Sequence, residues 1–213
     1  METLEDRAEQ RVVLRNISWE TYERLLEERG DSRAPRLAYD RGELEIMSPS
    51  SEHESVAYFA ALVVAVLAEE MRVNAYGVGS TTYRRGDFER GFEPDASFYI
   101  ANEERVRGKP RIDLYVDPPP DLVIEIDITS PSLDKFPIYA RLGVREVWRY
   151  DGARANVFVL EHGEYVEARG STALPPLTGE VLTRFVAESA AVGSTEWLRM
   201  VRRWAREHTG SSG

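Results

Sequence analysis

The chain has 213 residues, of which 42% are hydrophobic and 30% are charged, and these values favour one globular α/β domain. Its formal net charge of −10 argues against a broad basic face for sequence-independent nucleic-acid binding, although a local basic channel is compatible with it. The absence of cysteine excludes disulfides and thiolate metal sites, and only three histidines are present.

No apolar run reaches the length of a membrane span, and the N-terminal residues lack the apolar segment of a signal peptide. We therefore expect a soluble, cytoplasmic protein without a membrane partner. The whole chain, 1–213, is predicted to be one domain. Its expected parts are an N-terminal helix and hairpin (1–51), a core (52–150), a C-terminal hairpin and helices (151–208) and a flexible tail (209–213).

The first predicted elements are a helix and a β-hairpin. Ser18 is a candidate N-cap for a helix that ends at Gly30. Alternation of apolar and polar residues across a turn predicts a hairpin over 36–47. Glu43 and Glu45 share one face of its second strand, and a solvent-exposed face is their default interpretation.

A long helix and three strands are predicted next. Residues 52–74 are nearly free of glycine and proline and carry apolar side chains at helical spacing, which is typical of a helix packed on a sheet. Strands are then predicted over 75–85, 93–100 and 120–130, with a polar connection before the third strand.

A short helix follows, because Pro137 is tolerated only in a first helical turn. This spacing makes Asp134 the expected N-cap and Lys135 the first helical residue, and Gly143 the stop signal. Residues 144–150 are predicted to form the next strand.

The C-terminal part is predicted to form a hairpin over 155–161 and 164–168, followed by helices over 183–191 and 194–207. From residue 52 to residue 150 the predicted order is helix, three strands, helix and strand. This order indicates an α/β (α+β) fold in which helices flank a mixed sheet.

Two carboxylates interrupt the apolar strand predicted over 120–130. Glu125 and Asp127 stand at alternate positions, so both side chains point to one face. A buried carboxylate requires a cation, a hydrogen-bond donor or a raised pKa. The strand therefore predicts that polar partners meet this face.

Candidate partners occur on both sides of this strand in the sequence. Asp95 stands at the start of the preceding strand and Lys135 opens the helix that follows. Together with Glu125 and Asp127 they form a set of hard oxygen ligands for Mg²⁺ or Mn²⁺ with a lysine beside it. Such a set can activate a water molecule and neutralise the charge that develops during phosphodiester hydrolysis.

In this order of elements, Asp95, Glu125 and Lys135 resemble the PD-(D/E)xK nuclease superfamily, which has the restriction endonuclease-like fold. More closely, residues 40–150 are similar to the Uma-type restriction endonuclease family. The segments that carry this resemblance are Gly42–Pro49 with His53, Glu93–Asp95, Asp121–Glu125, Ser130–Ser132 with Lys135, and Tyr139–Trp148.

The resemblance implies that Asp95 and Glu125 are metal ligands, that Lys135 is the catalytic lysine, and that the substrate is DNA. The sequence departs from the superfamily pattern at Asp127, where a lysine usually stands. Asp127 is either a further metal ligand or an ion-pair partner of Lys135. The family pattern also makes Glu45 a candidate additional carboxylate of the site.

Other polar residues have structural interpretations. With no histidine nearby in the sequence, His53 is expected to serve a capping or structural role, and Tyr139 is expected to pack. The basic stretch over 199–206 is expected to be a solvated face or a subunit contact. The arginines at 84, 85 and 90 are better placed to touch a phosphate backbone.

Three functional hypotheses follow. The first is a Mg²⁺-dependent endonuclease acting on DNA, expected as a homodimer because a duplex has two strands to cut. The second is a nuclease-fold binding or assembly module that is catalytically weak or inactive, which the acidic charge and Asp127 favour. The third is a Mg²⁺-dependent enzyme that acts on small phosphate esters.

Overall fold

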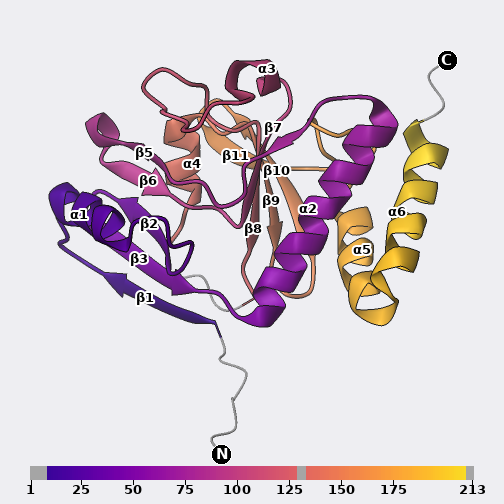
Figure 1. Ribbon diagram of the computed structural model, residues 1–213, viewed down its shortest axis with the longest axis horizontal. Helices are drawn as coiled ribbons and strands as arrows, with labels where there is room; N and C mark the ends of the chain where they lie inside the picture. The colour runs from indigo at the N-terminus through magenta and orange to yellow at the C-terminus, as the bar shows by residue number, and fades with distance from the viewer. Residues whose placement is uncertain (1–8, 129–132, 210–213) are drawn as a thin grey trace, which may run out of the picture.

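The computed structural model describes residues 9–128 and 133–209, arranged as two β-sheets with helices packed around them (Figure 1). The sequence segment Ser130–Ser132 and nearly all of the predicted tail at 209–213 lie outside these ranges. The fold belongs to the predicted α+β class. The prediction had one mixed sheet, whereas the structure divides its strands between two sheets.

The first sheet has five strands and is antiparallel. In sheet order its strands are β1 (Gln10–Leu14), β3 (Glu43–Ser48), β2 (Arg36–Asp40), β6 (Arg90–Phe92) and β5 (Tyr83–Arg85). Helix α1 (Trp19–Arg29) covers this sheet by burying Tyr22 and Leu26 against Tyr39 and Leu44. The Ser18 hydroxyl caps α1 and Gly30 follows its last turn, as predicted.

The second sheet has six strands, among which only β8 and β9 pair in parallel. In sheet order its strands are β11 (Glu164–Ala168), β10 (Ala155–Glu161), β9 (Glu146–Tyr150), β8 (Leu122–Ile126), β7 (Ala96–Tyr99) and β4 (Tyr76–Gly77). The predicted C-terminal hairpin is confirmed, and the predicted strand over 120–130 is confirmed in its central part.

Helices cover both faces of the second sheet (Figure 1). On one face lie α2 (Ser51–Met71), α5 (Gly179–Ala191) and α6 (Ser194–Thr209), whose apolar side chains form the larger core with Ile124 and Trp148. On the other face, α4 (Phe136–Leu142) buries Ile138 against the sheet. The remaining helical turns are the 3-10 helix η1 (Gly86–Phe88) and α3 (Glu103–Val106). None of the helices within the described ranges combines the length and apolar character that a membrane crossing needs.

The local structure differs from the prediction in both sheets. The strand expected over 75–85 is divided into β4 and β5, which belong to different sheets. Between them Gly79 adopts a positive φ of 61°, a conformation that favours glycine and lets the chain leave one sheet for the other. Strand β1, for which no strand was predicted, pairs with β3 at the edge of the first sheet.

The start of α4 also differs from the prediction. Lys135 is the N-cap residue and Phe136 is the first helical residue. The Asp134 carboxylate accepts a hydrogen bond from the backbone N–H of Phe136 at 3.1 Å, so it turns the chain just before the helix. Pro137 stands in the first turn and Gly143 ends the helix, as expected.

The segment Glu93–Asp95 joins the two sheets, because β6 ends at Phe92 and β7 begins at Ala96. The buried Glu93 carboxylate accepts hydrogen bonds from Arg29 and from the backbone N–H of Leu37 at 2.8 Å, which fastens it to the first sheet. Asp95 is thereby held where the second sheet begins, at the junction of the two sheets.

Candidate functional site

The two central carboxylates are neighbours in the second sheet, with Glu125 on β8 and Asp95 one residue before β7. Strands β7 and β8 are antiparallel with Ala96 opposite Ile124, so Asp95 lies beside Glu125 and on the same face. The backbone N–H of Ile126 donates to Asp95 Oδ2 at 2.7 Å. The structure therefore brings together the two residues for which the resemblance implies metal binding.

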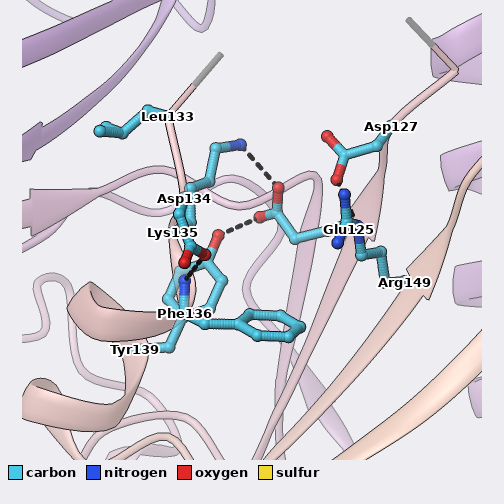
Figure 2. A pocket seen from close by; sticks show the side chains of 8 residues that line it. All are labelled: Glu125, Asp127, Leu133, Asp134, Lys135, Phe136, Tyr139 and Arg149. Carbon is cyan, nitrogen blue, oxygen red and sulfur yellow. Dashed lines mark hydrogen bonds and ion pairs between the residues drawn. The ribbon is translucent and has the colours of Figure 1, made fainter. Parts of the chain in front are cut away.

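Glu125 is enclosed by two donors from α4 and its N-cap (Figure 2). Lys135 Nζ lies 2.6 Å from Glu125 Oε2, and the Tyr139 hydroxyl donates to Glu125 Oε1 at 2.5 Å. All three side chains are buried. Tyr139 thus contributes a polar contact beyond the packing role that its sequence position predicts.

The ionisation of this pair is strongly perturbed. Burial raises the pKa of Glu125 to about 7, and this outweighs the opposing charge of Lys135. For Lys135, burial alone would lower the pKa, but the charges of Glu125 and Glu45 raise it above its ordinary value. Lys135 therefore stays charged at neutral pH, whereas Glu125 exchanges its proton in that range.

Asp95 has a contrasting environment. Its Oδ1 accepts from Arg36 and lies 2.7 Å from His53 Nε2, while its Oδ2 accepts from the Ile126 backbone. Burial would raise the pKa of Asp95, but the hydrogen bond from His53 and the charge of Arg36 lower it to about 2. Asp95 is therefore ionised throughout the physiological pH range.

His53, near the start of α2, joins Asp95 to the N-terminal part of the chain. Its Nδ1 lies 2.6 Å from Glu9 Oε2, so the fully buried imidazole is held between two carboxylates. Burial would lower the pKa of His53, but Asp95 and Glu9 raise it above its ordinary value. The structural role expected for His53 includes direct contact with a candidate metal ligand.

Asp127 and Glu45 occupy the same junction. Asp127 pairs with Arg11 at 3.0 Å and Arg149 at 2.8 Å, so the expected alternative of an ion pair with Lys135 is wrong. Glu45 is only 1% exposed, so a solvent-exposed face is also wrong for this residue. Its Oε1 lies 3.7 Å from both Lys135 Nζ and Arg11 Nη1, because the first sheet presses this face of β3 against the second sheet.

Sequence reasoning missed four charged residues of the site: Glu9, Arg11, Arg36 and Arg149. The first three come from β1, its lead-in and β2, and no local pattern links them to Asp95 or Asp127. The position of Arg149 could have been predicted, because the parallel pairing of β8 and β9 places it opposite Glu125. A correct pairing of two predicted strands would have placed it beside the site.

The arginines judged better placed to touch a phosphate backbone make ion pairs within the chain. Arg84, Arg85 and Arg90 pair with Glu23, Asp87 and Asp40 at 3.7, 2.7 and 2.9 Å, respectively. The basic stretch on α6 is similarly engaged: Arg202 and Arg206 lie 2.9–3.3 Å from Glu69 and Glu70 of α2. The two alternatives expected for the stretch over 199–206, a solvated face and a subunit contact, both stay predictions.

A pocket of about 390 Å³ opens beside Glu125 (Figure 2). Its charged lining consists of Glu125, Asp127, Asp134, Lys135 and Arg149. Its apolar lining consists of Leu133, Phe136 and the ring of Tyr139. The pocket thus gives a ligand access to the Glu125 side of the cluster.

The donor chemistry of the cluster fits a hard divalent cation. Mg²⁺ commonly takes one or two carboxylates and keeps several waters, and Asp95 and Glu125 supply such a pair. No group of three Asp, Glu or His side chains within 9–128 and 133–209 forms a ready-made metal cage. The pair therefore suits an ion that retains most of its water ligands.

The mixed sheet flanked by helices is a nuclease-like α+β fold, and it brings two buried carboxylates and a buried lysine together. Residues 19–188 match the Uma2 family, whose description is "Putative restriction endonuclease". The match covers most of the chain, and the protein therefore belongs to this family, as the sequence resemblance predicted.

A solved structure supports the same fold. The crystal structure of a "putative nuclease belonging to DUF820" from Anabaena variabilis ATCC 29413 superposes with a TM-score of 0.52. The similarity covers 80% of this chain and 99% of that chain, at 16% sequence identity, so it concerns the fold alone. No curated protein matches the sequence.

Proposed function

We propose that this protein is a divalent-metal-dependent endonuclease that hydrolyses DNA phosphodiester bonds. The observation that carries the proposal is the buried Lys135–Glu125 pair, 2.6 Å apart, which lies beside Asp95 and opens onto a pocket. Membership of a family described as restriction endonucleases supports the nuclease class.

Asp95 and Glu125 would hold the ion, Mg²⁺ or Mn²⁺, with Asp127 and Glu45 as additional carboxylates of the same cluster. When bound, such an ion polarises a phosphate oxygen and lowers the pKa of a bound water. The low pKa of Asp95 supports this assignment, because a carboxylate must be ionised to bind a cation.

Lys135 is the residue assigned to the reacting phosphate. Its ammonium group is held at the pocket wall, and its raised pKa keeps it charged. A charged donor in a water-poor site stabilises negative charge that develops on the phosphate in the transition state. The hydroxyl of Tyr139 positions this chemistry indirectly, because it fixes the orientation of Glu125.

Cleavage assays with Lys135 variants test this role. We expect Lys135→Met to lose at least about 100-fold in cleavage rate on plasmid and oligonucleotide DNA, as removal of a charge-stabilising donor does elsewhere. Thermal stability should also fall, because the Met variant loses one member of the buried Lys135–Glu125 pair, and thermal unfolding will check that the variant is folded under the assay conditions. Lys135→Arg, which retains the charge, should recover part of the rate. Cleavage at the wild-type rate by the Met variant would contradict the proposal.

Calorimetric titration with Mn²⁺ tests the metal assignment separately. Asp95→Asn keeps the size of the side chain but should weaken Mn²⁺ binding by at least about tenfold. Glu167→Gln, on an exposed ion pair with Arg154, is the matched control and should bind Mn²⁺ as the wild type does. Equal affinity in wild type and Asp95→Asn would refute the assignment of Asp95.

A second candidate is a nuclease-fold binding module without catalysis. It is favoured by the protein donors that already contact each oxygen of Asp95 and Glu125. It predicts DNA binding with no Mn²⁺-dependent cleavage of plasmid. An enzyme for small phosphate esters, in contrast, would hydrolyse nucleotides and leave plasmid intact. The expected homodimer remains a prediction that analytical ultracentrifugation can check.

A further inference from the structure

The pocket beside Glu125 combines an aromatic side chain with two cations, Lys135 and Arg149 (Figure 2). We infer that this pocket receives a single unpaired nucleotide of a DNA strand, with its base against Phe136 and its phosphate between Arg149 and Lys135. The inference rests on the proposed function and names the form of the substrate: single-stranded or locally unpaired DNA.

The aromatic side chain of the pocket, Phe136, packs against two other aromatic rings. The ring centroid of Phe136 lies 4.9 Å from that of Phe158 and 4.9 Å from that of Tyr165. These two rings, from β10 and β11, hold Phe136 in place while its side chain lines the pocket. A fixed aromatic ring is the usual platform on which unpaired bases stack, because every base presents a π-face.

Arg149 is equipped to bind a phosphate. Its Nε donates to Asp127 at 2.8 Å, and its guanidinium carbon lies 5.9 Å from the Phe136 ring centroid. Over the part of the chain that the structure describes, its two terminal amino groups have no hydrogen-bond acceptor, and its side chain is 33% exposed. A guanidinium fixed in this way can bind phosphate through two parallel hydrogen bonds.

The size and charge of the molecule favour an unpaired strand over a duplex. A volume of about 390 Å³ is in the range of small-ligand sites, which is roughly 300–1,000 Å³. Duplex binding without stacking depends on a broad basic surface, whereas the chain carries a net charge of −10. Arg84, Arg85 and Arg90 are engaged in ion pairs within the chain. Stacking of an unpaired base on an aromatic ring supplies affinity without a broad basic surface.

Fluorescence anisotropy of a labelled octathymidylate tests the inference on the full chain, in low salt with EDTA so that cleavage does not interfere. We expect the single strand to bind at least about tenfold more tightly than a duplex of the same length. Phe136→Leu should weaken single-strand binding roughly 5- to 100-fold, the range for loss of one base stack. Phe136→Trp should restore it, and thermal unfolding will confirm that both variants fold.

Arg149→Met should also weaken binding and should reduce the slope of log affinity against log salt by about 0.7, the value for one phosphate contact on a single strand. The matched controls are Tyr58→Leu, an aromatic side chain 60% exposed on α2, and Arg202→Met on α6. Both controls should bind as the wild type does. Equal binding of duplex and single strand, no binding of the single strand, or unchanged binding in Phe136→Leu would overturn the inference.

Failure of this inference can be told apart from failure of the proposed function. If Mn²⁺-dependent cleavage of intact duplex is unchanged by Phe136→Leu, the nuclease assignment would stand, and the proposal that the pocket binds an unpaired nucleotide would fail. If the octathymidylate binds in a way that depends on Phe136 and Arg149, but no DNA is cleaved in Mn²⁺, the nucleotide-binding pocket would stand and the nuclease assignment would fail.

Discussion

The candidate site has two halves that treat their carboxylates in opposite ways. On the closed half, Asp95 lies among Arg36, His53 and the Ile126 backbone, and its pKa is lowered to about 2. On the open half, Glu125 faces Lys135 at the wall of a pocket, and its pKa is raised to about 7. Both side chains are buried, so burial alone does not explain the difference.

The number of donors around each carboxylate explains it. Asp95 contacts the Arg36 guanidinium, the His53 imidazole and one backbone N–H, which together offset the cost of burying its charge. Glu125 has one charged donor and one hydroxyl, and the negative charges of Asp95 and Asp127 oppose its ionisation. The closed half therefore holds an ionised carboxylate, and the open half holds a carboxyl group whose pKa lies near neutrality.

The largest expected effect would break the closed half. Asp95→Ala removes the carboxylate that contacts both Arg36 and His53, and it leaves the buried Arg36 guanidinium without this partner. Loss of one member of a buried ion pair costs roughly 3–5 kcal/mol, and we expect the free energy of unfolding in urea to fall by that amount.

Glu167→Ala, which removes an exposed ion pair with Arg154, is the control for this substitution and should cost less than about 1 kcal/mol. If Asp95→Ala were no more destabilising than this control, the stabilising role of the closed half would have to be abandoned.

The pH dependence of stability should sharpen the comparison, because the pKa of Glu125 is raised whereas the pKa of Asp95 is lowered. The pKa of Glu125 is raised from 4.5 to about 7, so the folded chain holds this proton longer than the unfolded chain does. Its contribution to stability therefore declines as pH rises from about 4.5 through 7. The lowered pKa of Asp95 gives stability above 3.8 that is lost as pH falls toward 2.

Urea denaturation between pH 5 and 8 measures the first effect. Glu125→Gln, which keeps the side-chain size, should flatten the decline by about 1–3 kcal/mol, since one pKa unit corresponds to about 1.4 kcal/mol. His53, whose pKa is also raised, contributes a decline of the same sign that should remain in this variant. An unchanged slope in Glu125→Gln would show that Glu125 is ionised throughout this range.

The smallest expected effect concerns Asp127, which connects the halves through Arg11 and Arg149. A double-mutant cycle with Asp127→Asn and Arg149→Met should give a coupling energy of about 0.5–1 kcal/mol. The value is small because the Arg149 side chain is one-third exposed and solvent screens the pair. A coupling of several kcal/mol would mean that Arg149 belongs to the closed half.

Local sequence patterns predicted most of the elements. Ser18 and Gly30 bound α1 because capping and left-handed geometry are properties of single residues. The hairpin of β10 and β11 follows from alternation and a short turn. The restriction endonuclease-like class and the family were likewise accessible, because they depend on the order of elements and on short motifs.

The partners of the acids depended on the tertiary structure. Sequence alone indicated that Glu125 and Asp127 share a face of one strand and that Asp95 and Lys135 are candidate partners, and the resemblance implied their roles. That Asp127 pairs with Arg11, and that Glu45 is buried, depends on how the two sheets meet at Glu93–Asp95, whereas the Asp127–Arg149 pair follows from the pairing of β8 with β9. The Asp127–Arg11 pair joins residues 116 positions apart, and the Glu45–Lys135 pair joins residues 90 positions apart. The sequence therefore determined which groups carry charge, and only the packing of one sheet against the other decided which charges meet, because local periodicity carries no information about distant neighbours.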